Sequence, residues 1–168
     1  MKTIRKIQKV DIDNIYNLYK KTASAPGGLA RYEDEITKEY ISSFITQSML
    51  KGLSLVIEKD NHIIGEIHAY SPGLKVFNHV LSDLTICIHP DYQRQQYGKK
   101  IFSEFMKIVK IEMQDIKRVE LITRESNTKA IDFYKKIGFV IEGRLKNRID
   151  GISDDLENDI PMAWLRNS

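Results

Sequence analysis

The chain has 168 residues, of which 42% are hydrophobic and 29% charged, and its formal net charge is +3. This length suits one domain with a sizeable core, so we expect a single domain over residues 1–168. So small a basic excess argues against nucleic acid as a partner, because nucleic-acid binding usually needs a clustered basic face.

The first half of the chain predicts one strand, two helices and a hairpin. Apolar residues at helical spacing mark the helices, and two apolar runs separated by Asp60 and Asn61 indicate the hairpin. The expected elements are, in order, a strand at 3–10, a helix capped by Asp11, a loop at 22–31 that contains Pro26, Gly27 and Gly28, a helix that begins with the acidic turn Glu33, Asp34 and Glu35 and ends at Gly52, and strands at 53–59 and 62–70.

The second half alternates strands and helices. The expected elements are a strand at 80–88, a helix whose apolar face carries Ile101, Phe102, Phe105, Met106 and Val109, a strand at 118–123, a helix from about Thr128 that ends at Gly138, and strands at 139–147 and 158–165 around a turn centred on Asp150 and Gly151. Hairpins and helical crossovers together predict a mixed sheet, of class α/β or α+β, with helices on both faces.

Several residue types carry no special chemistry on this interpretation. Cys87, the single cysteine, excludes an internal disulfide, offers no metal-site spacing and is expected as a small buried hydrophobe, and no metal is expected. His62 and His68 are expected on the surface of the hairpin. The first residues, MKTIRKIQK, are charged but are followed by no uninterrupted apolar stretch, so we do not expect them to be a signal peptide. No segment approaches the roughly 18 apolar residues that span a membrane, so we expect a cytoplasmic protein without a membrane partner.

A polar turn, HPDYQRQQYGKK at residues 89–100, joins the strand at 80–88 to the next helix. A helix start exposes unpaired backbone N–H groups, and Arg94, Lys99 and Lys100 add positive charge there. A phosphate or pyrophosphate therefore suits this turn, although a solvated basic face has the same composition. The patterns GxxxxGK[ST] and GxGxxG are both absent.

A second motif, ESNTKAIDFYKKIGF, covers residues 125–139. Ala130, Ile131, Tyr134 and Ile137 form an apolar stripe of a helix that Gly138 ends. By itself this pattern indicates a core tyrosine with its hydroxyl at the edge of the core.

Both motifs, in this order, resemble those of the GNAT family, the GCN5-related N-acetyltransferases. Residues 93–98, QRQQYG, resemble the family's acetyl-CoA loop Q/R-x-x-G-x-G/A, except that Gln96 stands at the central glycine; residues 127–139 resemble its second motif. The resemblance implies a mixed, mostly antiparallel sheet of about seven strands with about four helices and a splayed parallel pair. The cofactor-binding residues that it implies are Ile86, Cys87, Ile88, Gln93, Arg94, Gln95, Gln96, Tyr97, Gly98, Lys99, Asn127, Ala130 and Tyr134.

The implied activity is direct transfer of acetyl from acetyl-CoA, the co-substrate, to a primary amine in a ternary complex. Backbone N–H groups at 86–88 would polarise the thioester carbonyl, and Tyr134 would protonate the departing thiolate. The amine must first lose a proton, for which Asp83 is the first candidate base and His79 the second, with a water relay as the alternative.

The implied acceptor is an amine of a small molecule or of a protein or peptide N-terminus. The GGLAR loop and the helix after it lie where the family places its acceptor-binding wall, so Arg31, Tyr32 and Glu33 are the candidate acceptor contacts; the alternative is a glycine-rich loop that only connects two helices. Carboxylates near the last turn either attract a cationic amine or form a solvated turn: Asp150, Asp154, Asp155, Glu157 and Asp159. Homodimers are common in the family. The alternative function is a non-catalytic acyl-CoA-binding module, which Gln96 favours and Tyr134 opposes.

Overall fold

The computed structural model describes residues 2–25, 29–150 and 155–167. Internal contacts divide the chain into two compact units, Met1–Tyr70 with Thr85–Gln114, and Ser71–Leu84 with Asp115–Ser168. The chain passes from one unit to the other within strand β4 (Val80–Ile88). The expectation of a single domain stays a prediction.

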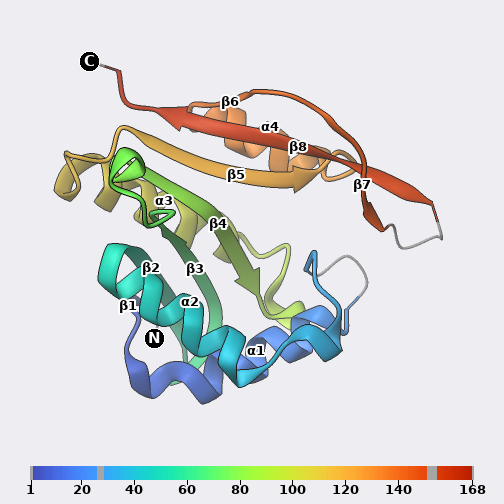
Figure 1. Cartoon of the computed structure of the whole chain (residues 1–168). Helices are drawn as coiled ribbons and strands as arrows, with labels where there is room; N and C mark the ends of the chain where they lie inside the picture. The colour runs from blue at the N-terminus through green and yellow to red at the C-terminus, as the bar shows by residue number, and fades with distance from the viewer. Residues whose placement is uncertain (1, 26–28, 151–154, 168) are drawn as a thin grey trace. The chain divides into compact units, whose positions relative to one another are not determined.

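The first unit is built on the antiparallel strands β1 (Lys2–Lys6), β2 (Gly52–Lys59) and β3 (His62–Tyr70). Helices α1 (Ile12–Ala23), α2 (Lys38–Lys51) and α3 (Tyr97–Glu112) pack on these strands. In Figure 1, α2 lies in front of β2 and β3 and α3 lies behind them, so the strands are covered on both faces.

The apolar faces of these helices explain the packing. All five residues expected on one side of α3 are buried: Ile101, Phe102, Phe105, Met106 and Val109. Ile15 and Leu18 of α1 and Ile41 and Phe44 of α2 belong to one core cluster. The 3.6-residue spacing of the apolar side chains therefore placed these helices correctly on the core.

The second unit is built around the long strand β8 (Leu156–Leu165). Strands β5 (Arg118–Arg124), β6 (Phe139–Ile141) and β7 (Leu145–Asp150) each pair with β8 antiparallel, and helix α4 (Thr128–Lys136) packs on β6. Strand β4 pairs with β5 in parallel at Val80–Arg118 and Leu81–Val119.

The expected class is confirmed. Within the described residues there are four α-helices and eight strands, which are mostly antiparallel with one parallel pair. The turn of the β2–β3 hairpin is also confirmed, because Asp60 and Asn61 have φ of 50° and 64°, the left-handed conformation that tight hairpins need. Gly52 does end α2; a Cβ there would lie 2.1 Å from the carbonyl oxygen of Ala69.

Three expectations about the elements of the first unit were wrong in detail. The strand expected at 3–10 ends at Lys6, and a 3₁₀ turn, Lys9–Asp11, follows it. Residues Glu33–Glu35 form a separate 3₁₀ turn, and α2 begins at Lys38, where the Thr37 side chain accepts a hydrogen bond from the N–H of Tyr40. Asp11 does precede α1, but its carboxylate binds the Arg5 guanidinium at 2.8 Å and does not cap the helix.

The strand expected at 139–147 is two strands, β6 and β7. Pro161 of β8 accepts a hydrogen bond from the N–H of Glu142 but has no N–H to return one. The ladder is therefore interrupted between Ile141, which pairs with Met162, and Leu145, which pairs with Asp159. Of the final turn, Gly151 lies outside the described residues and Asp150 ends β7.

In the part of the chain that the structure describes, no helix is both long and apolar enough to cross a membrane.

Candidate functional site

The polar turn before α3 is held by its own glutamines. The side chain of Gln93 donates to the carbonyl oxygen of Ile88 at 3.0 Å, and that of Gln95 donates to the carbonyl of Asp91 at 2.9 Å. His89 Nδ1 accepts from the N–H of Asp91 at 3.2 Å. These local bonds fix the backbone without glycine, which explains the turn's unusual composition.

Two residues of this turn are left-handed. Arg94 and Gln96 have φ of 59° and 66°, and Gln96 directly precedes the first residue of α3. Alternating left-handed residues at a helix start turn successive N–H groups toward one side, where an anion is bound well. Gln96 thus stands, with the backbone that glycine would adopt, at the position where the first motif expects glycine.

The side chains around the turn divide into those that face solvent and those that do not. Arg94, Gln96 and Lys99 are exposed, whereas the ring of Tyr97 is 4% exposed and packs against Tyr92. Tyr97 can therefore reach a ligand only through its backbone. A Cβ added at Gly98 would lie 3.6 Å from Ile88 Cγ1 and 3.7 Å from Ile86 Cδ1, an ordinary contact distance.

Cys87 is buried in the same unit, as expected. Its Sγ lies 3.2 Å from the Thr22 hydroxyl, and burial raises the pKa of the thiol well above its ordinary value. The side chain is therefore an unreactive thiol, and only its backbone remains a candidate for ligand contact.

The segment expected to form the acceptor wall belongs to the first unit. The guanidinium of Arg31 lies 3.9 Å from the centre of the Tyr40 ring, Tyr32 is 60% exposed, and the carbonyl oxygen of Glu33 accepts from Lys20 Nζ. Residues Pro26, Gly27 and Gly28 lie outside the described residues. A shallow hollow of about 530 Å³ adjoins this segment; its lining residues are Asn17, Lys20, Lys21, Ser24, Ala25, Glu33 and Pro90.

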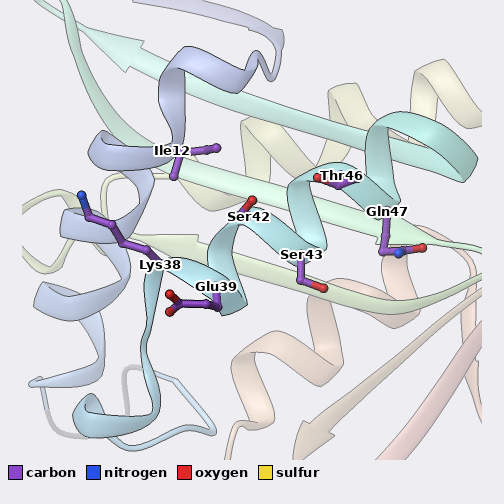
Figure 2. A pocket seen from close by; sticks show the side chains of 7 residues that line it. All are labelled: Ile12, Lys38, Glu39, Ser42, Ser43, Thr46 and Gln47. Carbon is purple, nitrogen blue, oxygen red and sulfur yellow. The ribbon is translucent and has the colours of Figure 1, made fainter.

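A second hollow lies on the outer face of α2 and contains none of the predicted site residues. Figure 2 shows its lining, which is Ile12, Lys38, Glu39, Ser42, Ser43, Thr46 and Gln47. Lys38 Nζ is bound by the Asp13 carboxylate at 2.6 Å. Because none of its lining residues belongs to either motif, we do not include this hollow in the candidate site.

A buried polar cluster was missed by the sequence analysis. Glu66 and His68 on β3 are 0% and 2% exposed; Glu66 accepts from the Tyr19 hydroxyl at 2.6 Å and lies 3.1 Å from His68 Nδ1. The His68 ring stacks on Phe44 at 4.0 Å. The expectation that His68 is a surface residue was therefore wrong, whereas His62 is exposed.

The signal for this cluster was the spacing of two polar residues on one strand face. Residues two apart on a strand point the same way, and here the shared face lies under α1 and α2. The sequence alone did not show that helices cover that face.

Asp83 and His79, the candidate bases, belong to the second unit and are exposed. Asp83 has φ of 53° inside β4, two residues after the last recorded β4–β5 pair at Leu81. A left-handed non-glycine residue within a strand costs about 1–3 kcal/mol and is typical of functional positions. The carbonyl oxygen of His79 accepts from the N–H of Lys117 at 2.8 Å, at the entrance to β5.

The second motif forms the turn after β5 and helix α4. Asn127 precedes α4, but its side chain makes no capping bond and is exposed, although asparagine is a strong capping residue. Tyr134 is 8% exposed between Phe133 and Phe139, and this burial raises the pKa of its hydroxyl to about 12. Ala130 is half-buried on the same helix.

Two carboxylates of β8, Glu157 and Asp159, have arginine partners. Glu157 lies 3.2 Å from Arg124 Nη1, and Asp159 lies 3.1 Å from Arg148 Nη1. Asp150 and Asp155 are exposed, and Asp154 lies outside the described residues. The residues of this group with arginine partners are therefore poor candidates for attracting an amine.

Residues 12–139 match the acetyltransferase (GNAT) family. A putative ribosomal protein bS18-alanine N-acetyltransferase of Bacillus subtilis is 27% identical over 144 residues, which are 86% of this chain and 84% of the relative. The ribosomal protein bS18-alanine N-acetyltransferase of Escherichia coli (strain K12) is 24% identical over 166 residues, 97% of each chain.

A solved structure of yncA, a putative acetyltransferase from Salmonella typhimurium with its cofactor acetyl-CoA, has the same fold. Its TM-score is 0.85 at 15% identity, over 100% of this chain and 95% of that one. The match to the family spans both motifs and both units of the chain. The chain belongs to the GNAT family and is an acetyl-CoA-dependent N-acetyltransferase.

Proposed function

We propose that the acceptor is the amino group of a protein or peptide N-terminus, and that acetyl passes to it directly in a ternary complex. The relatives named as alanine N-acetyltransferases of a ribosomal protein support this acceptor class, because one of them matches over 97% of both chains. A primary amine of a small molecule is the other acceptor class that the motifs allow.

The turn before α3 is the proposed binding site for the pyrophosphate of acetyl-CoA. Backbone N–H groups of residues 93–99 hold the pyrophosphate of acetyl-CoA, and Arg94 and Lys99 neutralise its charge. The observation that supports this is the pair of left-handed residues, Arg94 and Gln96, immediately before a 16-residue helix with Gly98 in its first turn. Acetyl-CoA supplies the acetyl group as an activated thioester.

Other residues are proposed to bind the pantetheine arm and the thioester of acetyl-CoA. The Asn127 amide and Ala130 contact the pantetheine arm, and backbone groups of residues 86–88 polarise the thioester carbonyl. The exposed, non-capping side chain of Asn127 supports its part in this arrangement.

Tyr134 and Asp83 carry the proton transfers. Asp83 takes the proton that the acceptor ammonium must lose, directly or through water, with His79 as the other candidate. When the amine nitrogen bonds to the acetyl carbon and the carbon–sulfur bond breaks, Tyr134 gives its proton to the leaving sulfur. Because burial raises the pKa of Tyr134 to about 12, the hydroxyl is protonated throughout the neutral range and can act as this acid.

The test begins with thermal unfolding in the presence of acetyl-CoA. A concentration of 100 times Kd should add about 2.7 kcal/mol of stability, and no shift at millimolar acetyl-CoA would contradict the proposed co-substrate site. Release of CoA thiol is then measured with a peptide that begins with alanine, the same peptide with a blocked N-terminus, polyamines, free amino acids and aminoglycosides. The free-amine peptide should be acetylated and the blocked one should not.

Tyr134→Phe separates catalysis from binding in the same assay. Loss of a general acid should lower kcat by about 10²-fold or more, while the Kd for acetyl-CoA changes little. Equal turnover would remove the role of acid from Tyr134. Acetyl-CoA binding without turnover on any amine would favour the acyl-CoA-binding module.

A further inference from the structure

The turn that carries Asn127 is tied to the last two strands by a network of side chains. Glu125, the second residue before Asn127, accepts from Arg144 Nε at 2.6 Å, from Arg144 Nη2 at 2.7 Å and from Asn158 Nδ2 at 2.6 Å. The N–H of Glu125 donates to the carbonyl oxygen of Asn158 at 2.9 Å. Arg144 directly precedes β7, and Asn158 lies on β8.

Asn158 also reaches β7 itself. Its Oδ1 accepts from the N–H of Asn147 at 2.9 Å. Asn147 has φ of 51° and lies where the β7–β8 register shifts, between Leu145 and Ile149. One side chain therefore binds both the turn before α4 and the irregular centre of β7.

A second acidic residue of β8 holds the same turn. Glu157 Oε1 accepts from the N–H of Ser126 at 3.2 Å, and Glu157 Oε2 accepts from Arg124 Nη1 at 3.2 Å. Both residues that directly precede Asn127 are thus bound to β8. Asn127 itself is left with an exposed side chain that caps nothing.

This network fixes the orientation of the turn more than it stabilises the fold. The Arg144 and Glu125 side chains are 51% and 39% exposed, and exposed ion pairs contribute little to stability. Their two parallel bonds nevertheless fix a plane and an angle. Hydrogen bonds from Arg144 and Asn158 lower the pKa of Glu125 to about 2, so the carboxylate is ionised at all physiological pH values.

We propose that Glu125, Arg144 and Asn158 are positioning residues that couple the Asn127 turn to the β7–β8 pair, so that acetyl-CoA binding at Asn127 orders β7. This inference rests on the proposed role of Asn127. Fixing the turn on the pantetheine arm fixes Glu125, and Glu125 holds Arg144 and Asn158 in the geometry that the Asn147 N–H requires. The exposed Asp150, at the end of β7, is then presented in one orientation.

Hydrogen exchange read by mass spectrometry tests this coupling. Saturating acetyl-CoA should slow amide exchange in peptides covering 125–130 and also, by about threefold or more, in those covering 145–150 of the wild-type protein. In Glu125→Gln and Arg144→Met, acetyl-CoA should still protect 125–130 but no longer protect 145–150.

Arg148→Met is the matched control. Arg148 lies on β7, has a side chain that is 50% exposed and pairs with Asp159 of β8, whereas the described turn residues 125–127 bind Arg144, Asn158 and Glu157. This variant should keep the protection of 145–150. The thermal midpoints of the free variants should match the wild type, which separates a positioning role from a structural one.

Three results would overturn the inference, and they differ from failure of the proposed function. Wild-type protection confined to 125–130 would show that no coupling exists. Protection of 145–150 that persists in both Glu125→Gln and Arg144→Met, or that disappears equally in Arg148→Met, would show that these residues do not carry it. If acetyl-CoA shifts neither the thermal midpoint nor any exchange rate, the proposed co-substrate site itself is wrong.

Discussion

Gly98→Ala should raise the stability of the free protein and leave its affinity for acetyl-CoA unchanged. Gly98 is the second residue of α3, where alanine is preferred to glycine by about 0.5–1 kcal/mol. The added Cβ would meet Ile88 and Ile86 at 3.6 and 3.7 Å, so no clash with the protein offsets that gain. For a chain of this size the expected rise in thermal midpoint is about 1–4 °C.

The affinity for acetyl-CoA should stay the same, because the motif Q/R-x-x-G-x-G/A admits alanine at the position of Gly98. A concentration of 100 times Kd should therefore add about 2.7 kcal/mol to the wild type and to the variant alike. The ligand-induced shift of about 5–11 °C should then be equal in the two proteins.

Thermal unfolding with and without acetyl-CoA measures both effects in one experiment. Isothermal titration calorimetry gives the Kd independently. A Gly98→Ala protein that binds acetyl-CoA about tenfold or more weakly than the wild type would refute the alignment of residues 93–98 with the acetyl-CoA loop. A less stable free protein would refute the estimate of its local packing.

Three further perturbations test other parts of the structure. Gln96→Gly removes the strain of a non-glycine residue in the left-handed conformation and should raise the free energy of unfolding by up to about 1 kcal/mol. If the Gln96 side chain crowds the phosphates, the variant should also bind acetyl-CoA more tightly, and unchanged or weaker binding would show that it does not. Asp83→Asn should lower turnover most at low pH, where least amine is unprotonated, and an unaltered pH profile would favour a water relay. Tyr19→Phe removes the buried hydrogen bond to Glu66 and should lower the free energy of unfolding, measured by chemical denaturation, by about 1.5–3 kcal/mol. The control is Tyr16→Phe on the same helix, which should lower it by less than about 0.5 kcal/mol. An equally small change for Tyr19→Phe would contradict the importance of the bond.

Much of the candidate site could be predicted from local sequence. The helix start at Tyr97 and the positions of Asn127 and Tyr134 on the turn and helix that follow β5 depend on apolar periodicity and on residues adjacent in the chain. The buried environment of Tyr134 also follows from its place on an apolar stripe.

Other features depended on residues far apart in the sequence. The buried state of His68 follows from helices α1 and α2 covering one face of β3. The break between β6 and β7 follows from Pro161, which lies about twenty residues later on the paired strand β8. The spacing of Glu66 and His68 and the proline at 161 are visible in the sequence, but neither shows which helix or strand lies beside them in the fold.

The sequence by itself determined the order of the elements, the two motifs and hence the family, because these are written in short-range spacing. Tertiary structure alone decided that Arg94, Gln96 and Asp83 are left-handed, that Glu66 is a buried partner of Tyr19, and that Glu125 is bound to Asn158. The physical reason is the same in each case: a strained backbone angle, a buried polar group or a fixed hydrogen bond persists only where its partners are in place, and folding brings those partners together from distant parts of the sequence.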